Sequence, residues 1–193
     1  MIAAPGIGRY QAFGNLFADY DGQTYRLDRH PVMQRHPATP MDEADVARHL
    51  GKQTERAIGL VDLAAIKAGN GSAQRAAQLA AGKTLISLDV VDEQTLVWAG
   101  REIWEGRGNG LFAIGSQGIE YALTAYWRAA GLLAPQSPPP RAAAANQIIV
   151  ASGSVSPGTA NQIEWGLAHG FDVVSVDPTQ VLAQASWNNE IAQ

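Results

Sequence analysis

The chain has 193 residues, of which 46% are hydrophobic and 17% charged, and its formal net charge is −4. This composition is typical of a globular protein with one good core, and its 14 scattered basic residues form no stripe that could neutralise a nucleic-acid backbone. The absence of cysteine excludes disulfides, thiol nucleophiles and thiolate metal sites, and no apolar run is long enough to span a membrane. We therefore expect a cytoplasmic protein without nucleic-acid or membrane partners.

The first predicted element is a β-hairpin from Phe13 to Leu27, in which Asp21-Gly22 is the turn. Residues 28–40 contain three prolines and two histidines and are expected to form a loop. A helix is predicted to begin at Thr39, with Pro40 in its first turn, and to continue to about residue 53.

The chain then alternates regularly between two kinds of segment. Short apolar runs at 58–63, 84–91 and 111–115 are separated and followed by helical patterns at 72–81, 92–105 and 117–130. Strands that are apolar throughout and alternate with helices are typical of a parallel sheet covered on both faces. The sequence therefore predicts an α/β fold with a parallel sheet flanked by helices, followed by the start of a second α/β domain.

Residues 134–146 are rich in proline and alanine and are predicted to be a semi-stiff linker. After it we expect strands at 147–151 and 172–177, a helix near 157–169 and a further helix from Pro178 onward. This is too little to bury a sheet on both faces. We therefore expect exposed apolar side chains and self-association of the free chain, with the exposed side chains including Ile148, Val150, Val173 and Val176.

Two apolar runs each lead into a glycine and serine turn that precedes a helical segment. The turns are Gly115-Ser116-Gln117-Gly118 and Ser152-Gly153-Ser154-Val155-Ser156. At the carboxyl end of a parallel strand, such a turn offers backbone N–H groups and a helix dipole to an anion. The alternative is that glycine serves only the backbone angles of the turn or close packing. Neither turn matches the phosphate loop or the complete dinucleotide fingerprint.

Other polar residues could also carry chemistry. The loop at 29–41 places arginines and histidines beside rigid prolines, which suits a carboxylate or phosphate, but composition alone favours a surface loop whose histidines are solvated or cap backbone groups. Asp89 and Asp92 end an apolar run, where they could contact a ligand or cap the next helix; capping is expected for Asp92. No histidine spacing typical of zinc occurs, so we predict no structural metal.

The order of several motifs resembles the four-carbon acid sugar kinase family. The motifs are Gly8-Arg9, Phe13-Gly14-Asn15-Leu16-Phe17, Arg35-His36-Pro37 with Pro40-Met41, Gln53 before Ile58-Gly59-Leu60-Val61, and the later Ser152-Gly153-Ser154-Val155-Ser156 with Thr159 and Gln162. The resemblance covers nearly the whole chain but only the middle of the family sequence. Family members also have an amino-terminal segment with an Asp-Asp-x-Thr-Gly motif and a glycine-rich region late in the sequence. Neither feature has a counterpart in this chain.

The resemblance implies ATP- and Mg²⁺-dependent phosphorylation of a four-carbon acid sugar of the threonate, erythronate or 3-oxo-tetronate type. Residues 1–133 would be a partial sugar-acid-binding domain and residues 147–193 the beginning of a nucleotide-binding domain. At the first turn this chain has Gly-Ser-Gln-Gly where many members have Gly-Gly-Ser-Gly. The implied sugar-acid residues are Arg9, Arg35, His36, Gly115 and Ser116, and the implied nucleotide residues are Ser152, Gly153, Ser154 and Ser156.

The resemblance assigns no catalytic residue to this chain, because the base that accepts the hydroxyl proton would lie outside these residues. The expected partners are a sugar acid and ATP, with further copies or complementary segments of the same enzyme. Two other functions stay open. One is a non-catalytic sugar-acid-binding protein without the transferase elements, and the other is a nucleotide-dependent enzyme of different chemistry on a doubly wound sheet.

Overall fold

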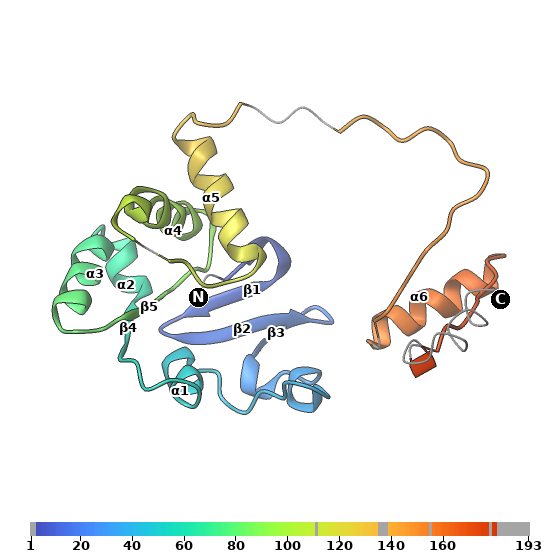
Figure 1. Ribbon diagram of the computed structural model, residues 1–193, viewed down its shortest axis with the longest axis horizontal. Helices are drawn as coiled ribbons and strands as arrows, with labels where there is room; N and C mark the ends of the chain where they lie inside the picture. Colours follow the sequence, from blue (N-terminus) through green and yellow to red (C-terminus); the bar gives the residue numbers. More distant parts are fainter. Residues whose placement is uncertain (1–2, 111, 135–138, 155, 178, 181–193) are drawn as a thin grey trace. The chain divides into compact units, whose positions relative to one another are not determined.

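The computed structural model describes residues 3–110, 112–134, 139–154, 156–177 and 179–180 (Figure 1). The chain divides into two compact units, residues 1–138 and 139–193. The predicted linker at 134–146 includes residues 135–138, which lie outside the described residues. Within the described part, no helix combines the length and the apolar character needed to cross a membrane.

The first unit begins with a short 3-10 helix, η1 (Pro5–Ile7), and an antiparallel sheet of β1 (Arg9–Ala12), β2 (Asn15–Tyr20) and β3 (Gln23–Arg26). The hairpin predicted around Asp21-Gly22 is confirmed as β2 and β3. A second hairpin, β1 with β2, turns at Phe13-Gly14. Both turns have two residues with positive φ, which is the geometry that matches the twist of paired strands.

The α/β prediction is confirmed by the remainder of this unit. Strands β4 (Ile58–Val61) and β5 (Leu85–Leu88) pair in parallel through the helices α2 (Leu63–Lys67) and α3 (Gly71–Ala80). Helices α4 (Glu93–Gly106) and α5 (Gln117–Ala129) follow and pack together (Figure 1). The core is built from small and branched side chains of these elements, including Val61, Leu88, Val90, Leu96, Ala99 and Ala122.

Helices α4 and α5 run in the same direction and approach closely. Gly100 faces Ala122, and the rings of Trp104 and Trp127 meet edge to face with centroids 5.0 Å apart. Parallel helices are expected where each follows a strand of the same parallel sheet. The pattern of strand, helix, extended segment and helix is therefore retained from β5 to α5.

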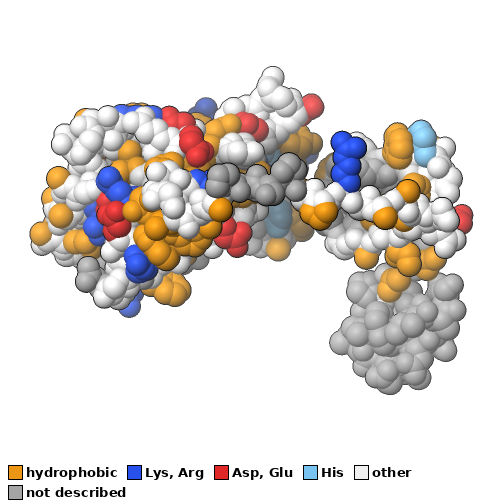
Figure 2. All heavy atoms as spheres, turned by 90° about the horizontal axis from the view of Figure 1, so that it is seen from above, with side chains coloured by type: hydrophobic (Ala, Val, Ile, Leu, Met, Phe, Trp, Pro, Cys, Tyr) orange, Lys and Arg blue, Asp and Glu red, His pale blue; other side chains and the backbone are white. Residues whose placement is uncertain are grey.

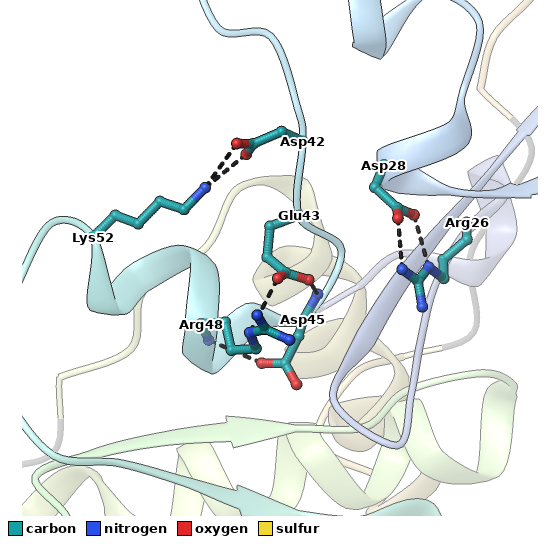
Figure 3. A network of polar contacts seen from close by, with 7 residues as sticks. All are labelled: Arg26, Asp28, Asp42, Glu43, Asp45, Arg48 and Lys52. Carbon is teal, nitrogen blue, oxygen red and sulfur yellow. Dashed lines mark hydrogen bonds and ion pairs between the residues drawn. The ribbon is translucent and has the colours of Figure 1, made fainter.

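The loop after β3 contains two 3-10 helices, η2 (Leu27–Arg29) and η3 (Met33–Arg35), and leads to α1 (Val46–Gly51). The predicted helix start at Thr39 is therefore wrong by several residues. Asp45 is the cap instead, because its side chain accepts a hydrogen bond from the backbone N–H of Arg48 at 2.9 Å. Ion pairs Arg26–Asp28, Glu43–Arg48 and Asp42–Lys52 surround this helix and loop (Figure 3).

The strand predicted at 111–115 does not form in the described residues 112–115. Phe112 is 84% exposed and Ile114 57% exposed. An apolar run becomes a strand only when a neighbouring strand pairs with its backbone groups, and no strand of the described part of the chain pairs with this segment. Leu111 lies outside the described residues.

In the second unit, the described residues contain α6 (Pro157–Ala168), close to the predicted helix, and no strand. The strand predictions at 147–151 and 172–177 are therefore wrong, since these segments have no ladder partner among the described residues. The expected exposure is confirmed: Ile148, Val150, Val173 and Val176 are all more than half exposed. The helix predicted from Pro178 onward falls almost wholly outside the described residues.

Candidate functional site

Asp89 follows β5 and is fully buried. Its Oδ1 accepts hydrogen bonds from Gln11 Nε2 at 3.1 Å and the Gly14 N–H at 3.0 Å. Its Oδ2 accepts from the N–H groups of Phe13 at 2.6 Å and Leu63 at 2.9 Å. Four donors saturate a carboxylate. Of the two roles left open for Asp89, the structure therefore favours a structural one: it fixes the turn before β2 and the start of α2.

Asp92 caps α4, as predicted. Its side chain accepts from the Thr95 N–H at 2.9 Å within a capping box, and it pairs with Lys67 at 2.5 Å. Burial by itself would raise the pKa of Asp92, but the hydrogen bonds from Lys67 and Thr95 outweigh it and hold the pKa below its ordinary value. Neither acid at the end of β5 is thus left for a ligand.

Arg9 opens β1 and is exposed. Its guanidinium donates to the carbonyl oxygens of Ile7 at 3.3 Å and Gly8 at 3.1 Å. In the register of the sheet, Arg9 lies opposite Ala18, which lies opposite Tyr25. Directly opposed residues share one face of a sheet, so Arg9 and Tyr25 flank the buried Ala18 on the same face.

His30 connects this face with the predicted Arg35-His36 loop. It is buried beside Tyr20 and Tyr25, at ring-centroid distances of 5.4 and 5.9 Å. Its Nδ1 accepts hydrogen bonds from the N–H groups of Val32 and Met33, each at 3.2 Å, and so fixes the start of η3. Burial, and next the positive charge of Arg9, lower the pKa of His30.

His30 predicts a pH dependence of stability. The unfolded chain takes up this proton near pH 6.5, above the pKa of the folded chain. Stability should therefore be complete above about pH 7 and fall as the pH drops through this range. His30→Asn, which keeps an acceptor for the two N–H groups, should remove this loss between pH 7.5 and 5.5 in urea unfolding. An equal loss in both proteins would contradict the assignment.

The two predicted residues at the end of η3 differ in what they contact. Arg35 is exposed, and its side chain makes no hydrogen bond or ion pair with the described residues. His36 is half-buried and its Nδ1 accepts from the Thr39 N–H at 3.0 Å, so this ring serves the local turn. Arg35 is thus the one of the pair that could meet a carboxylate or phosphate at no cost in existing contacts.

Gly115 and Ser116 precede α5 and are exposed. Ser116 is the cap residue, but its side chain makes no capping hydrogen bond, so the first turn of α5 keeps N–H groups available for an anion. A hollow of about 560 Å³ lies farther along α5 and extends to Arg128, bordered also by Pro5 and Gly6 of η1 and by Glu93 and Leu96 of α4. Gly115, Ser116 and Arg9 are not among the residues that line it.

The structure brings the predicted sugar-acid residues together only in part. His30, which the sequence placed in the loop at 29–41 without a role of its own, joins the surroundings of Arg9 to the segment that carries Arg35. No described contact joins Gly115 or Ser116 to Arg35 or His36. The dipeptide Phe13-Gly14, analogous to Asp21-Gly22, was the available signal for the first hairpin and so for the placement of Arg9.

The predicted nucleotide residues lie in the second unit and form a group of their own. Ser156 caps α6 by accepting from the Thr159 N–H at 3.2 Å, and Ser154 and Ser156 hydroxyls are 3.2 Å apart. Ser152, Gly153 and Ser154 are exposed, and a side chain at Gly153 would meet nothing within 4 Å. This turn thus has room for a ligand against its backbone, although α6 is already capped by its own serine.

Comparison with known proteins adds three findings. A family described as a sugar-binding N-terminal domain matches residues 1–123. A 3-oxo-isoapionate kinase of Paraburkholderia graminis is 48% identical over 182 residues, covering 94% of this chain and 39% of that protein. A 3-oxo-tetronate kinase of Cupriavidus necator is 31% identical over 154 residues, covering 76% of this chain and 34% of that protein.

Solved structures with a similar fold are also found. A crystal structure of a Haemophilus influenzae protein superposes with a TM-score of 0.58 and 24% identity, covering 87% of this chain and 38% of that one. The chain therefore spans about two fifths or less of the length of each of these proteins.

Proposed function

Because the chain belongs to the four-carbon acid sugar kinase family through its sugar-binding N-terminal domain, we propose that residues 1–133 bind the acid sugar that an ATP-dependent kinase phosphorylates. The observation that carries this proposal is the match over residues 1–123 together with 48% identity to a named kinase. The chain spans less than two fifths of each of these two relatives, so phosphoryl transfer is proposed of the whole kinase. That kinase would work in the cytoplasm, where ATP is available.

Both relatives are named as kinases of a 3-oxo acid, and 3-oxo acids are the proposed substrate class. It would present a carboxylate and several hydroxyls. Arg35 offers a guanidinium that has no hydrogen bond or ion pair among the described residues, and the first turn of α5, which the Ser116 side chain does not cap, offers backbone N–H groups. Arg9 and His36 are included in the proposal on the resemblance, since no described contact joins the Arg35-His36 segment to the turn before α5. Gly115 would let the acid approach the backbone closely.

ATP would lie against the second unit, where Ser152, Gly153, Ser154 and Ser156 form the exposed turn before α6. The fit is partial, because Arg141 is the only basic residue between 139 and 193. Bound ATP supplies the phosphoryl group, and the turn can supply hydroxyl and N–H donors to it. No group of three His, Asp or Glu able to hold a metal occurs in the described ranges. Mg²⁺ commonly binds through substrate phosphates and one or two carboxylates, so it would arrive with ATP.

The test is isothermal calorimetry of the chain with 3-oxo-tetronate, 3-oxo-isoapionate, threonate and erythronate, alongside ADP release from ATP and Mg²⁺. Saturable binding of a 3-oxo acid without turnover is the expected result. Binding of none of these acids would overturn the proposal. If acid binds but no turnover appears after the remaining portions of the Paraburkholderia relative are added, the non-catalytic sugar-acid-binding alternative holds.

Arg35→Gln should weaken binding of the acid at least about tenfold, as expected for the loss of a charge-assisted hydrogen bond worth about 1.5–3 kcal/mol. The stability of the chain should not change, because this side chain has no partner to lose among the described residues. Arg29→Gln, an exposed arginine of η2 in the same loop, is the matched control and should bind normally. Equal affinity of both variants would remove Arg35 from the site.

A further inference from the structure

Two hairpin turns of the antiparallel sheet have the same backbone conformation but different residues. Phe13-Gly14 joins β1 to β2 with φ values of 48° and 76°, and Asp21-Gly22 joins β2 to β3 with φ values of 49° and 72°. Aspartate or asparagine before glycine is the usual pair in such a turn, because their short polar side chains tolerate a positive φ. A bulky aromatic residue is strained there. Phe13 is therefore an exception to the preference that Asp21 follows.

The Phe13 turn is held in this conformation by contacts of its backbone. The Phe13 N–H donates to Asp89 Oδ2 at 2.6 Å, and the Gly14 N–H donates to Asp89 Oδ1 at 3.0 Å. The Phe13 carbonyl accepts from Asn15 Nδ2 at 3.0 Å, and the Gly14 carbonyl accepts from the Val46 N–H at 2.9 Å. None of these hydrogen bonds uses the Phe13 ring, so an asparagine at this position would keep all of them with less strain.

The ring of Phe13 reaches the surface, since the residue is 61% exposed. Figure 2 shows hydrophobic side chains at the surface in several places on the first unit, so exposure alone does not distinguish this residue. Exposure combined with a strained backbone does distinguish it. Strained residues that the surrounding structure enforces cluster at ligand sites, where function and not folding explains the choice of side chain. The Phe13 ring is therefore a candidate for contact with a ligand.

The Phe13 turn lies at the carboxyl ends of β4 and β5. Asp89, which binds the turn, directly follows β5, and its Oδ2 also accepts from the N–H of Leu63, just after β4. Open α/β sheets bind ligands outside the carboxyl ends of their strands. Helix α4 begins at this edge and α5 packs parallel to it, so the start of α5 lies at the same edge. The Phe13 ring and the Gly115-Ser116 turn thus belong to one edge of the fold.

We infer that the Phe13 ring is an apolar wall of the acid-sugar site, on which the carbon-bound hydrogens of the substrate pack. This inference rests on the proposed function, in which residues 1–133 bind the acid. Arg35 and the first turn of α5 would hold its carboxylate and hydroxyls, which leaves the carbon skeleton without a partner. Ligand sites commonly provide aromatic surface for such a skeleton and use a few polar groups to fix its orientation. A short polar residue at position 13 would suit the turn but could not provide that surface.

The test compares the wild-type chain with Phe13→Asn in urea unfolding and in calorimetry with 3-oxo-tetronate and 3-oxo-isoapionate. The midpoint of unfolding should rise, because asparagine suits the turn, while affinity for the acid should fall at least about tenfold through loss of the ring. Phe13→Tyr keeps the ring and should bind within about threefold of wild type. In NMR spectra, carbon-bound protons of the acid should shift upfield on binding to the wild type, because they lie over the ring, and should not do so with Phe13→Asn.

Asp21→Phe is the matched control, since it places the same ring in the same turn geometry at the other, exposed hairpin. It should lower the midpoint of unfolding and leave acid binding unchanged. Equal binding by wild type and Phe13→Asn would overturn the inference and leave the proposed function standing, whereas no binding by the wild type would defeat both. A lower midpoint for Phe13→Asn would show that the ring serves the fold, which also overturns the inference. If the wild type forms a dimer that Phe13→Asn abolishes, a second copy covers the ring and the inference is wrong.

Discussion

Replacing Asp89 by alanine is expected to lower the free energy of unfolding by about 4 kcal/mol. The carboxylate accepts four hydrogen bonds, three of them from the backbone N–H groups of Phe13, Gly14 and Leu63. Its removal leaves buried donors without acceptors and a cavity beside them. The loss should appear as a lower midpoint in urea unfolding followed by circular dichroism.

Asp89→Asn distinguishes the loss of hydrogen-bond acceptors from the loss of side-chain volume. The amide keeps the shape but turns two hydrogens toward groups that are themselves donors, so about half of the alanine loss is expected. Asp21→Asn is the matched control, because this exposed aspartate sits at positive φ in a hairpin turn where asparagine is equally suited. If the alanine variant unfolds within about 1 kcal/mol of wild type, Asp89 does not hold the three elements together.

Gly100→Ala is expected to cost about 3 kcal/mol and to separate α4 from α5. A Cβ at Gly100 would overlap the carbonyl group of Ala122 and lie 2.9 Å from Tyr126 Cβ. Backbone cannot yield as a flexible side chain can, so the helices must move apart. Because α5 begins at the predicted Gly115-Ser116 turn, affinity for the acid should fall together with stability.

The comparison for this variant is Gly51→Ala at the end of α1, where an added Cβ meets nothing within 4 Å. That change should be neutral or slightly stabilising, since alanine favours a helix. Thermal unfolding of both variants and calorimetry with the acid measure the effects. A Gly100→Ala protein as stable as Gly51→Ala would show that the two helices tolerate separation.

The elements that sequence reasoning placed well are those whose signals are local. Asp92 and Thr95 form a capping box within one turn, and Asp21-Gly22 specifies its hairpin by backbone angles alone. The alternation of apolar runs with helical patterns was enough for the α/β class. Such features depend on residues only a few positions apart, so the interacting residues can be identified from the sequence alone.

The wrong predictions all concern segments whose state depends on distant partners. The apolar runs at 111–115 and 147–151 have strand composition, but a strand needs a ladder, and the described residues provide none. The helix expected at Thr39 begins at Val46, because Asp45, held opposite Asn15 of β2, caps it.

The same distinction applies to the candidate site. The sequence by itself determined the fold class, the resemblance of the motifs and the residue types available to an anion. Only the tertiary structure decided that Asp89 is saturated by four donors, that His30 links Arg9 to η3, and that Arg35 is free within the described residues. These properties depend on burial and on hydrogen bonds between residues far apart in the chain, and the linear order of side chains does not record them.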